Sequence, residues 1–377
     1  MIRYLRRIVY CVALALAWQA APVGAQTKGE PVKIGAVLSL TGPGAGIGQP
    51  ERAGILLAEQ AINAAGGIGG APIKVLIEDD GSKPDIAKTK AEGLIFDAKV
   101  VAMIGPTLTA STGAIGAITN GEGMAELTFT GLGPKIEKTY KSLFHILPPQ
   151  ELNARAMLEY TTKSLKVKRI GILHDTGYGQ AVMNSLDALR EKYGVEFVAV
   201  EKFEVGATDV TAQAAKVRAA NPDVVFVIAT SPVPFRNARQ VKIDQPIVSA
   251  IGSASYEYIR GIGEYADDIV FPEFLVGENP KPEQAKFVAA FQKANGALPK
   301  NFEAAGWDAV HIAAAAIGKA GPGAGPKDIA TAMRGVHQGA MAKYDFSRDD
   351  MTGIDLSSYV FSKVVKGKFE RLPFVAK

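Results

Sequence analysis

Residues 32–43 read VKIGAVLSLTGP, an apolar run followed by a polar turn that contains glycine and proline. A short, continuous apolar run bounded by turn residues is typical of a buried strand in a parallel α/β unit. Apolar side chains then recur on one helical face from 51 to 64, and glycines at 66 and 67 end this segment. A buried strand followed by an amphipathic helix is the repeating unit of an α/β fold.

The same alternation continues along the chain and then restarts. Residues 168–173 read KRIGIL and echo the first run in arrangement, without a detectable sequence repeat. Strands are expected at 73–77, 100–104, 127–130, 196–200, 224–228, 247–250, 269–271, 358–365 and 368–374. Helices are expected at 180–192, 210–220, 234–241 and within 282–335, which a loop interrupts at 321–326. We therefore predict an α/β protein with two doubly wound, Rossmann-like lobes.

The first 25 residues differ in composition from the rest. Three arginines begin the chain, an apolar run follows at 8–18, and Val23-Gly24-Ala25 closes the segment with small residues. This order is typical of a secretory signal peptide. The apolar run has about half of the roughly 20 residues that a membrane-spanning helix needs, which favours a cleaved signal over a retained anchor. We predict a signal peptide at 1–25 and a mature protein in the periplasm.

Charge and cysteine content narrow the class of protein. The single cysteine, Cys11, lies in the predicted leader, so disulfides are not expected to stabilise the mature chain. Without the leader the chain has 39 basic and 38 acidic residues, a formal charge of +1. A balanced charge without basic blocks gives no reason to expect nucleic acid or an anionic membrane as a partner. Roughly 350 residues exceed the usual size of one core, which favours two domains.

The motifs of common enzymes and cofactor sites do not occur in the sequence. The glycine-rich segment 42–48 fails the dinucleotide spacing, because Ile47 and Gln49 stand where G-x-G-x-x-G needs glycine. The four histidines are scattered, without the spacing of metal ligands. We interpret as helix caps and solvated turns the acidic runs at 78–80, 267–268 and 349–350. We expect no cofactor, no metal and no enzyme activity; the alternative, a secreted α/β enzyme, requires titratable groups at the strand ends.

Seven short segments follow one another in an order that is specific as a set. They are IGAVLSLTGP (34–43), INAAGGIGG (62–70), EDD (78–80), IG (104–105) with 107–112, GILHD (171–175), YG (178–179) and WDAV (307–310). Together they resemble the branched-chain amino-acid-binding family of ABC-transporter solute receptors, which has the type I periplasmic-binding-protein fold. The resemblance implies a three-strand hinge, with lobe one at 28–147 and 275–350 and lobe two at 148–274 and 351–377.

The resemblance also implies a role and partners. A receptor of this kind binds a small ligand between its closing lobes and delivers it to permease subunits in the inner membrane. We expect a monomer. A sensor of the same fold that feeds a signalling partner is the alternative.

The expected ligand site lies beyond the carboxyl ends of the strands, where helix N-termini offer free N–H groups. The resemblance implies that lobe one holds the ligand's carboxylate through the hydroxyls of Thr109 and Thr130, with Leu108 and Gly131 beside them. A hydroxyl near a helix N-terminus is an anion site on physical grounds as well. Helix capping is the alternative role of these threonines. Tyr178 is expected to cover the ligand from lobe two.

Departures from the family pattern concern the ligand. Amino-acid receptors pair the ligand's ammonium with an acidic residue on a lobe-two loop, and here Ile251 stands there, next to Gly252. Leu132, Ile47 and Thr230 replace a hydroxyl residue, an aromatic residue and a tyrosine. Burial of an ammonium without an anionic partner costs on the order of several kcal/mol. We therefore predict a carboxylate ligand without an α-ammonium, such as a benzoate or phenylpropenoate, in a pocket lined by Ile47, Leu108, Tyr178 and Trp307. A branched-chain or other hydrophobic amino acid is the alternative ligand.

Overall fold

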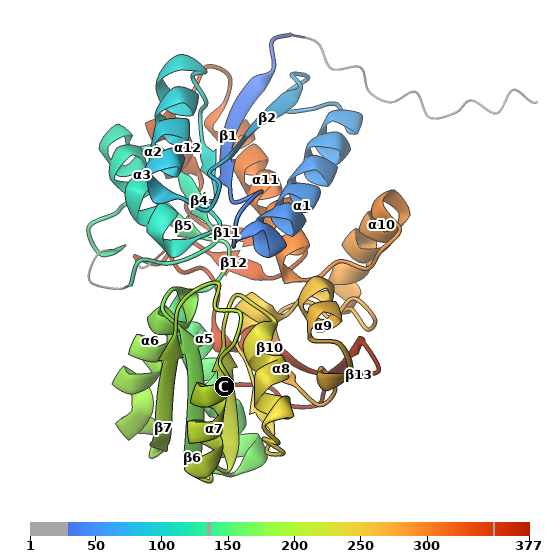
Figure 1. Ribbon diagram of the computed structural model, residues 1–377. Helices are drawn as coiled ribbons and strands as arrows, with labels where there is room; N and C mark the ends of the chain where they lie inside the picture. Colours follow the sequence, from blue (N-terminus) through green and yellow to red (C-terminus); the bar gives the residue numbers. More distant parts are fainter. Residues whose placement is uncertain (1–28, 134–136, 350) are drawn as a thin grey trace, which may run out of the picture.

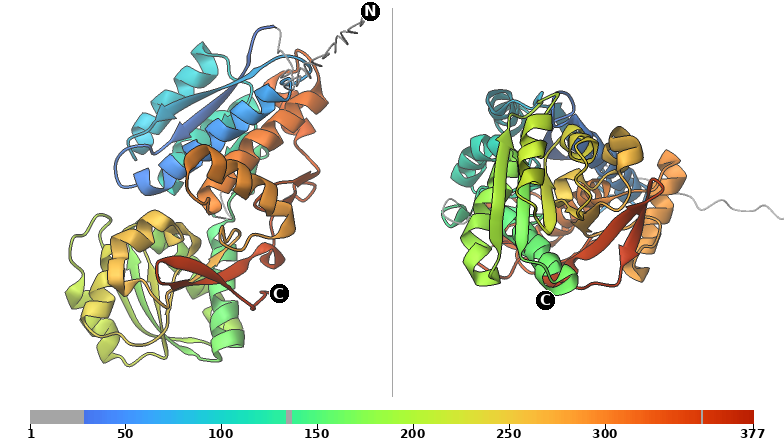
Figure 2. Two further views of the ribbon diagram at one scale, coloured as in Figure 1. Left: turned by 90° about the vertical axis from the view of Figure 1, so that its right-hand side faces the viewer. Right: turned by 60° about the horizontal axis from the view of Figure 1, so that its bottom comes forward.

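The computed structural model describes residues 29–133, 137–349 and 351–377. The predicted signal peptide at 1–25 therefore lies outside the described residues. Two α/β lobes lie one above the other (Figure 1). The C-terminus lies beside the lower lobe (Figure 2). Within the described ranges, no helix is both long and apolar enough to cross a membrane.

Lobe one, the upper lobe in Figure 1, is built on a parallel sheet in the order β2-β1-β3-β4-β5. Its strands are β1 (Val32–Leu38), β2 (Ile73–Asp79), β3 (Met103–Ile104), β4 (Glu126–Thr128) and β5 (Leu143–His145). One face is covered by α1 (Ala45–Ala64) and α11 (Asn301–Ala320), the other by α2 (Pro84–Glu92) and α3 (Thr109–Glu122). The lobe also contains α10 (Ala285–Asn295), α12 (Pro326–Ala332) and a hairpin of β11 (Val336–Gln338) and β12 (Lys343–Asp345).

Lobe two has a sheet in the order β14-β13-β10-β9-β8-β6-β7. Its strands are β6 (Arg169–Asp175), β7 (Glu196–Phe203), β8 (Val224–Ile228), β9 (Ile247–Val248), β10 (Val270–Glu273), β13 (Val360–Val365) and β14 (Lys368–Leu372). Its helices are α5 (Gln150–Glu159), α6 (Tyr178–Tyr193), α7 (Thr211–Ala219), α8 (Val233–Gln240) and α9 (Tyr256–Ile262). Strands β7-β6-β8-β9-β10 repeat the order of the lobe-one sheet, which confirms the predicted second copy of the architecture. Antiparallel β13 and β14 extend this copy.

The chain passes between the lobes three times. The passages lie between β5 and α5, between β10 and α10, and between β12 and β13 (Figure 2). The first continues directly into α5, and the third ends in a short 3-10 turn at Leu356–Ser358. The predicted lobe limits fall within these passages and, residue by residue, stay predictions.

Strand β1 shows why its apolar run is continuous. Ile34, Ala36 and Leu38 belong to the same buried cluster as the apolar face of α1 and α11. Val37 belongs to the cluster formed by α2 and α3 on the opposite side. Because successive side chains of a strand point to opposite faces, a strand covered on both faces needs apolar residues at every position.

Helices α1 and α11 are in direct backbone contact. A Cβ atom on Gly54 would lie 1.9 Å from the carbonyl oxygen of Glu303, and one on Gly306 would lie 2.2 Å from that of Glu51. Since real Cβ atoms do not approach so closely, both positions require glycine. This contact holds the chain that returns after β10 against the first strand–helix unit of lobe one.

The predicted start of the first helix needs correction. Helix α1 begins at Ala45, six residues before the predicted start, and contains Pro50. Its glycine-rich first turns pass so close to the end of β1 that a Cβ on Gly48 would lie 2.2 Å from the Ser39 oxygen. Gly48, a residue of the glycine-rich segment 42–48, is therefore part of the helix and allows this close packing.

The acidic run 78–80 was interpreted as caps and solvated turns. Asp80 does cap a turn, because it accepts a hydrogen bond from the N–H of Ser82 at 2.7 Å, but its solvation was predicted wrongly. Asp80 is fully buried, and it accepts hydrogen bonds from the hydroxyls of Ser39 at 2.7 Å and Ser111 at 2.9 Å. This carboxylate ties the loops after β1 and β2 to the first turn of α3. Asp79 does serve a turn, because it accepts a hydrogen bond from the N–H of Gly81 at 2.9 Å.

Candidate ligand-binding site

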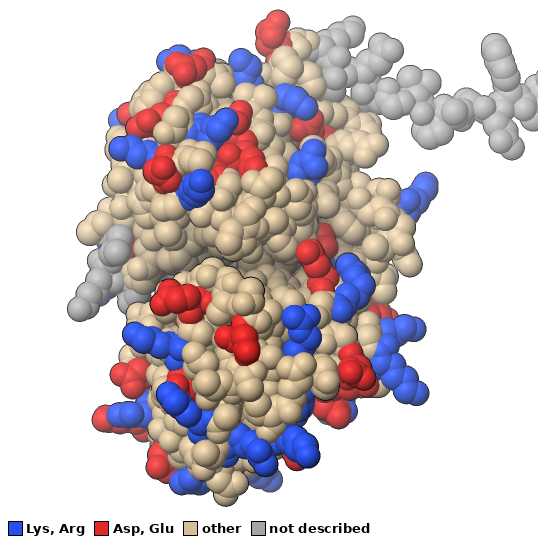
Figure 3. Space-filling model, viewed as in Figure 1, with Lys and Arg blue, Asp and Glu red and all other residues tan. Residues whose placement is uncertain are grey.

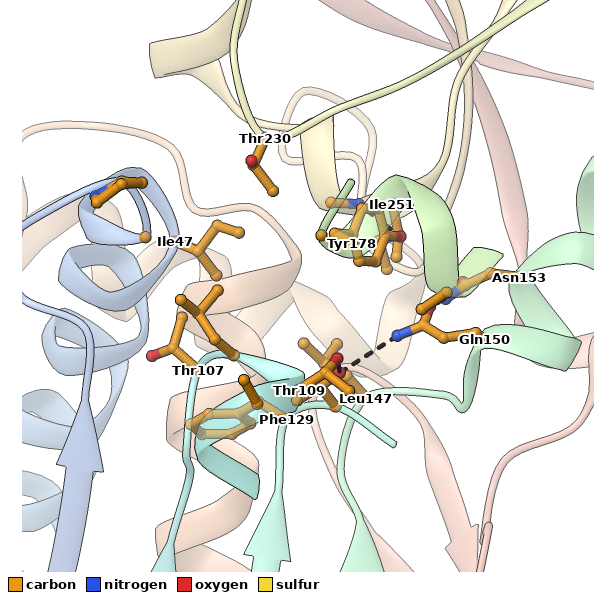
Figure 4. Close-up of a pocket in the computed structure, with 18 of the residues that line it drawn as sticks. Ile47, Thr107, Thr109, Phe129, Leu147, Gln150, Asn153, Tyr178, Thr230 and Ile251 are labelled. Carbon is orange, nitrogen blue, oxygen red and sulfur yellow. Dashed lines mark hydrogen bonds between the residues drawn. The ribbon is translucent and has the colours of Figure 1, made fainter. Parts of the chain in front are cut away.

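A cavity of about 390 Å³ lies between the two lobes (Figure 4). It is lined by the loops after β1, β3 and β4 of lobe one and by those after β6, β8 and β9 of lobe two. The first passage between the lobes and the start of α11 complete its wall. The carboxyl ends of the strands in doubly wound sheets are the expected place for a ligand. In the space-filling view, the part of lobe one that borders the groove is largely uncharged (Figure 3).

The lobe-one wall combines two hydroxyls with a helix N-terminus. The hydroxyl oxygens of Thr109 and Thr130 lie 2.8 Å apart and share a hydrogen bond. Helix α3 begins at Thr109, and the N–H of Thr112 bonds to the carbonyl of Leu108 as in a first helical turn. The N–H groups of a first turn have no acceptor within their own helix and carry a partial positive charge. This wall can therefore hold an anion without a cationic side chain.

A chain of neutral polar side chains leads away from this pair of hydroxyls. Gln150, at the start of α5, donates from Nε2 to the Thr130 hydroxyl at 3.2 Å. Asn153 donates from Nδ2 to Oε1 of Gln150 at 3.1 Å. The hydroxyl of Tyr359 donates to Oδ1 of Asn153 at 2.7 Å. Both amides are buried, so their hydrogen bonds replace those that water would make.

The lobe-two wall is apolar apart from a few hydrogen-bonded groups. Tyr178 lies at the start of α6, and its hydroxyl accepts a hydrogen bond from the N–H of Gly252 at 3.3 Å. Burial raises the pKa of the Tyr178 hydroxyl well above its ordinary value, so this hydroxyl keeps its proton. Tyr178 and Ile251 lie across the cavity from Ile47 and Phe129 (Figure 4). Thr230 donates to Asp175 through both its N–H and its hydroxyl.

None of the described residues that line the cavity is charged. Asp175 lies behind the lobe-two wall and accepts hydrogen bonds on both oxygens, from the N–H groups of Gly177 and Gly179 on one and from Thr230 on the other. These bonds hold the loops after β6 and β8 together. A buried carboxylate that already accepts four hydrogen bonds has no acceptor site left for a ligand.

Two further carboxyl groups lie behind the lobe-one wall. Burial raises the pKa of Glu51 well above its ordinary value, although Thr107 donates a hydrogen bond to it. Glu51 is therefore expected to be neutral. Burial opposes ionisation of Glu137 as well, but the hydrogen bonds from His145 and from backbone N–H groups hold its pKa below the ordinary value. Glu137 is thus ionised and paired, with its Oε2 atom 3.3 Å from Nε2 of His145.

Most of the residues predicted for the site are brought together. The cavity is lined by Ile47, Leu108, Thr109, Thr130, Tyr178, Thr230 and Gly252, all named from the sequence. Gly131 and Trp307 are not among its described lining residues. Trp307 instead packs on Phe287, with ring centroids 5.4 Å apart, and on His311. Leu132, the residue that replaces a family hydroxyl, also lies outside the lining.

Sequence reasoning missed several residues of the lining, namely Phe129, Leu147, Gln150, Asn153 and Phe302. Phe302 lies on the buried apolar face of α11, together with Ala305 and Ala309. It precedes Trp307 by five residues, which is about 140° around a helix, so the two cannot face the same side. Gln150 and Asn153 follow a passage between lobes, where the sequence pattern gives no direction for the side chains.

The fold and the cavity define a class, the two-lobed α/β receptors that bind a small molecule between their lobes. A family model described as periplasmic binding protein matches residues 31–368. The chain therefore belongs to the periplasmic binding protein family, and the resemblance to its branched-chain amino-acid-binding members is confirmed. Members of this family are substrate-binding proteins of ABC transporters and not enzymes.

Relatives and solved structures agree with this assignment. The chain is 27% identical over 310 residues to the leucine-, isoleucine-, valine-, threonine- and alanine-binding protein of Pseudomonas aeruginosa, with 81% of this chain and 82% of that protein covered. The branched-chain amino acid transporter substrate-binding protein of Streptococcus pneumoniae, solved with isoleucine, matches with a TM-score of 0.82 at 25% identity, covering 90% of this chain and 98% of that one. A type 1 periplasmic binding protein from Bordetella pertussis matches with a TM-score of 0.82 at 26% identity, covering 91% and 100%.

Proposed function

We propose that this chain is the periplasmic receptor of an ABC importer for a small carboxylate that lacks an α-ammonium. The observation that carries this proposal is the charge pattern of the cavity. The described lining holds no charged side chain, while a helix N-terminus and two hydroxyls converge on one wall. A carboxylate finds donors there, but an ammonium would be buried without an anionic partner, at a cost on the order of several kcal/mol.

The walls favour an aromatic or otherwise apolar body for the ligand. The rings of Phe129, Tyr178 and Phe302 line the cavity together with aliphatic side chains. A volume of about 390 Å³ lies at the small end of the range for ligand pockets, roughly 300–1,000 Å³. A benzoate or phenylpropenoate combines the required carboxylate with a flat apolar body of suitable size.

The remaining parts of the proposal follow the family. The chain is exported by its N-terminal leader, acts as a monomer and delivers its ligand to permease subunits in the inner membrane. Relatives whose names include leucine, isoleucine and valine support a second candidate ligand, a hydrophobic amino acid. Ile251 argues against that candidate, because it lines the cavity and the resemblance to the family implies an acidic residue at this position in amino-acid receptors. A sensor role of the same fold would use the same pocket.

A thermal-shift screen of the purified protein tests the proposal. It compares benzoate, cinnamate and 3-phenylpropanoate with leucine, isoleucine, valine and phenylalanine. A ligand at a hundred times its Kd adds about 2.7 kcal/mol to the free energy of unfolding, which a shift in Tm reports. We expect stabilisation by at least one of the aromatic acids. Stabilisation by leucine without a response to any aromatic acid would overturn the proposal.

Removal of one hydroxyl tests the carboxylate site itself. In Thr109→Val the ligand loses one hydrogen bond to its charged group, so we expect the Kd of the acid found in the screen to rise roughly ten- to hundredfold. Thr112→Val is the matched control, because Thr112 is a buried threonine of the same helix that does not line the cavity. Equal affinities of Thr109→Val and the unmodified protein would place the carboxylate elsewhere.

A further inference from the structure

The hydrogen bonds that join Tyr359, Asn153, Gln150 and Thr130 all run in one donor-to-acceptor direction. Tyr359 is fully buried, and burial raises the pKa of its hydroxyl well above the ordinary value, so it always carries a proton to donate. It donates this proton to Oδ1 of Asn153, and Nδ2 of the same amide donates to Oε1 of Gln150. Gln150 in turn presents its Nε2 donor, not its oxygen, to the Thr130 hydroxyl.

This direction determines how many hydroxyl protons of Thr109 and Thr130 remain free to bond a ligand. The hydroxyls of Thr109 and Thr130 have two protons and share one hydrogen bond. Because Gln150 offers Thr130 a donor, neither hydroxyl proton is used to bond Gln150. One proton of the pair is thus left over for the ligand. If Gln150 presented its oxygen instead, Thr130 would donate to Gln150 and Thr109 to Thr130, and the pair would offer the ligand lone pairs alone.

The residues of this hydrogen-bonded series come from the connections between the lobes. Gln150 and Asn153 lie at the start of α5, just after the first passage, and Tyr359 ends the third. The ring of Tyr359 packs against Phe274 of the second passage, with centroids 4.4 Å apart. All three passages therefore meet at Tyr359, the first donor of the series, and this packing holds its hydroxyl in place.

We propose that Tyr359, Asn153 and Gln150 are positioning residues that keep one hydroxyl proton of the Thr109–Thr130 pair available, and so select a ligand group that accepts hydrogen bonds over one that donates them. The inference builds on the proposed function, because a carboxylate is such an acceptor. It adds that selectivity is set by the hinge, through residues that do not all touch the ligand.

Neutron diffraction from crystals of the ligand-free, deuterium-exchanged protein tests the direction independently of any ligand. We expect deuterium on Nε2 of Gln150 facing the Thr130 hydroxyl, and deuterium on the Tyr359 hydroxyl facing Oδ1 of Asn153. A Gln150 oxygen facing Thr130 would overturn the inference. Because no ligand is present, failure of the proposed function and failure of this inference are distinguishable.

Binding of a matched pair of probes tests the consequence. The probes are 3-phenylpropanoate, whose head group accepts hydrogen bonds, and 3-phenylpropanamide, whose head group also donates them. In Tyr359→Phe the Asn153 and Gln150 amides lose their fixed orientation, so we expect the preference for the acid over the amide to fall at least about tenfold. Tyr344→Phe is the matched control, because it removes the hydroxyl of another buried tyrosine, one that bonds Asp308 in lobe one. An unchanged preference in Tyr359→Phe, with Tm within a few degrees of the unmodified protein, would contradict the inference.

Discussion

At the scale of single residues, the charge of the pocket wall depends on the side chain at position 251. Ile251 is buried at the start of a short 3-10 turn and faces the cavity from lobe two. The nearby acidic residue, Asp175, uses its carboxylate oxygens to accept hydrogen bonds from the loops that it holds together. With an apolar residue at 251, no negatively charged side chain of the described lining faces the cavity from lobe two.

Substitution Ile251→Asp tests this role. A carboxylate in the pocket repels a carboxylate ligand and can pair with an ammonium, so we expect the Kd for 3-phenylpropanoate to rise at least about tenfold at pH 8 while affinity for phenylalanine appears or increases. Isothermal titration calorimetry measures both. Ile251→Leu keeps the volume and the lack of charge, and is expected to retain the selectivity of the unmodified protein. Unchanged binding of the acid by Ile251→Asp would show that the ligand does not lie near this residue.

A second prediction at this scale concerns Glu126, a fully enclosed residue of β4. Burial raises the pKa of its carboxyl group to about 8, although Thr119 donates a hydrogen bond of 2.6 Å. The folded protein thus binds a proton that the unfolded chain releases near pH 4.5. The resulting stability is fully present below pH 4.5 and is lost as pH rises toward 8, by up to about 1.4 kcal/mol per pH unit.

Glu126→Gln removes this titration. We expect the variant to gain stability relative to the unmodified protein as pH rises from 5 to 8, because the amide stays neutral at every pH. Urea unfolding at both pH values measures the difference in free energy. A difference that is the same at pH 5 and pH 8 would show that Glu126 is not protonated in the folded protein.

At the scale of elements, the contact between α1 and α11 assembles lobe one from distant parts of the sequence. A methyl group on Gly54 would overlap the backbone of α11. We expect Gly54→Ala to lower the free energy of unfolding by roughly 1–3 kcal/mol, because two helix backbones must move apart. Denaturant unfolding followed by circular dichroism measures this loss.

Gly121→Ala is the matched control for that substitution. Gly121 lies in α3 with nothing within 4 Å of its Cβ position. Alanine there is expected to raise stability by about 0.5–1 kcal/mol, because the unfolded chain loses freedom and the helix gains propensity. If both alanine variants were destabilised to the same degree, the close contact between α1 and α11 would not be the cause.

The elements also show how far the sequence alone could predict the fold. The apolar run at 32–38 coincides with β1, because the residues from Ile34 to Leu38 carry no polar side chain and are buried between the two helical layers. Strands β5 (LFH), β11 (VHQ) and β12 (KYD) were not predicted, since each is short and contains polar residues that interrupt any apolar run. The start of α1 was misplaced because glycine has the same signal in a loop and in a tightly packed helix.

The site was predictable to a similar degree and for related reasons. Loops after strands were located correctly, so Thr109, Thr130 and Tyr178 do line one cavity. Trp307 was placed in the pocket through the resemblance to the family, whereas its ring packs on Phe287 and is not among the described residues of the lining. Gln150 could not be inferred, because its position depends on how the lobes are joined and not on any local pattern.

At the scale of the whole molecule, the arrangement of the pocket couples binding to lobe movement. Thr109 contributes from lobe one and Tyr178 from lobe two, and three passages of the chain connect the lobes. A ligand that contacts both walls stabilises the conformation in which they are close. We expect a saturating acid ligand to lower the radius of gyration measured by small-angle X-ray scattering. A radius that does not change between the ligand-free and saturated protein would contradict closure on the ligand.

The proposed pocket accepts a carboxylate and rejects an α-ammonium, and two pairs of ligands isolate that one group. Isothermal titration calorimetry of the purified protein with 3-phenylpropanoate against phenylalanine, and with 4-methylpentanoate against leucine, compares molecules that differ only in the ammonium. We expect the acid without the ammonium to bind more tightly in at least one pair, by about a hundredfold or more, because an unpaired buried ammonium costs several kcal/mol. Tighter binding of phenylalanine and of leucine than of their partner acids would contradict the proposed preference for a ligand without an α-ammonium.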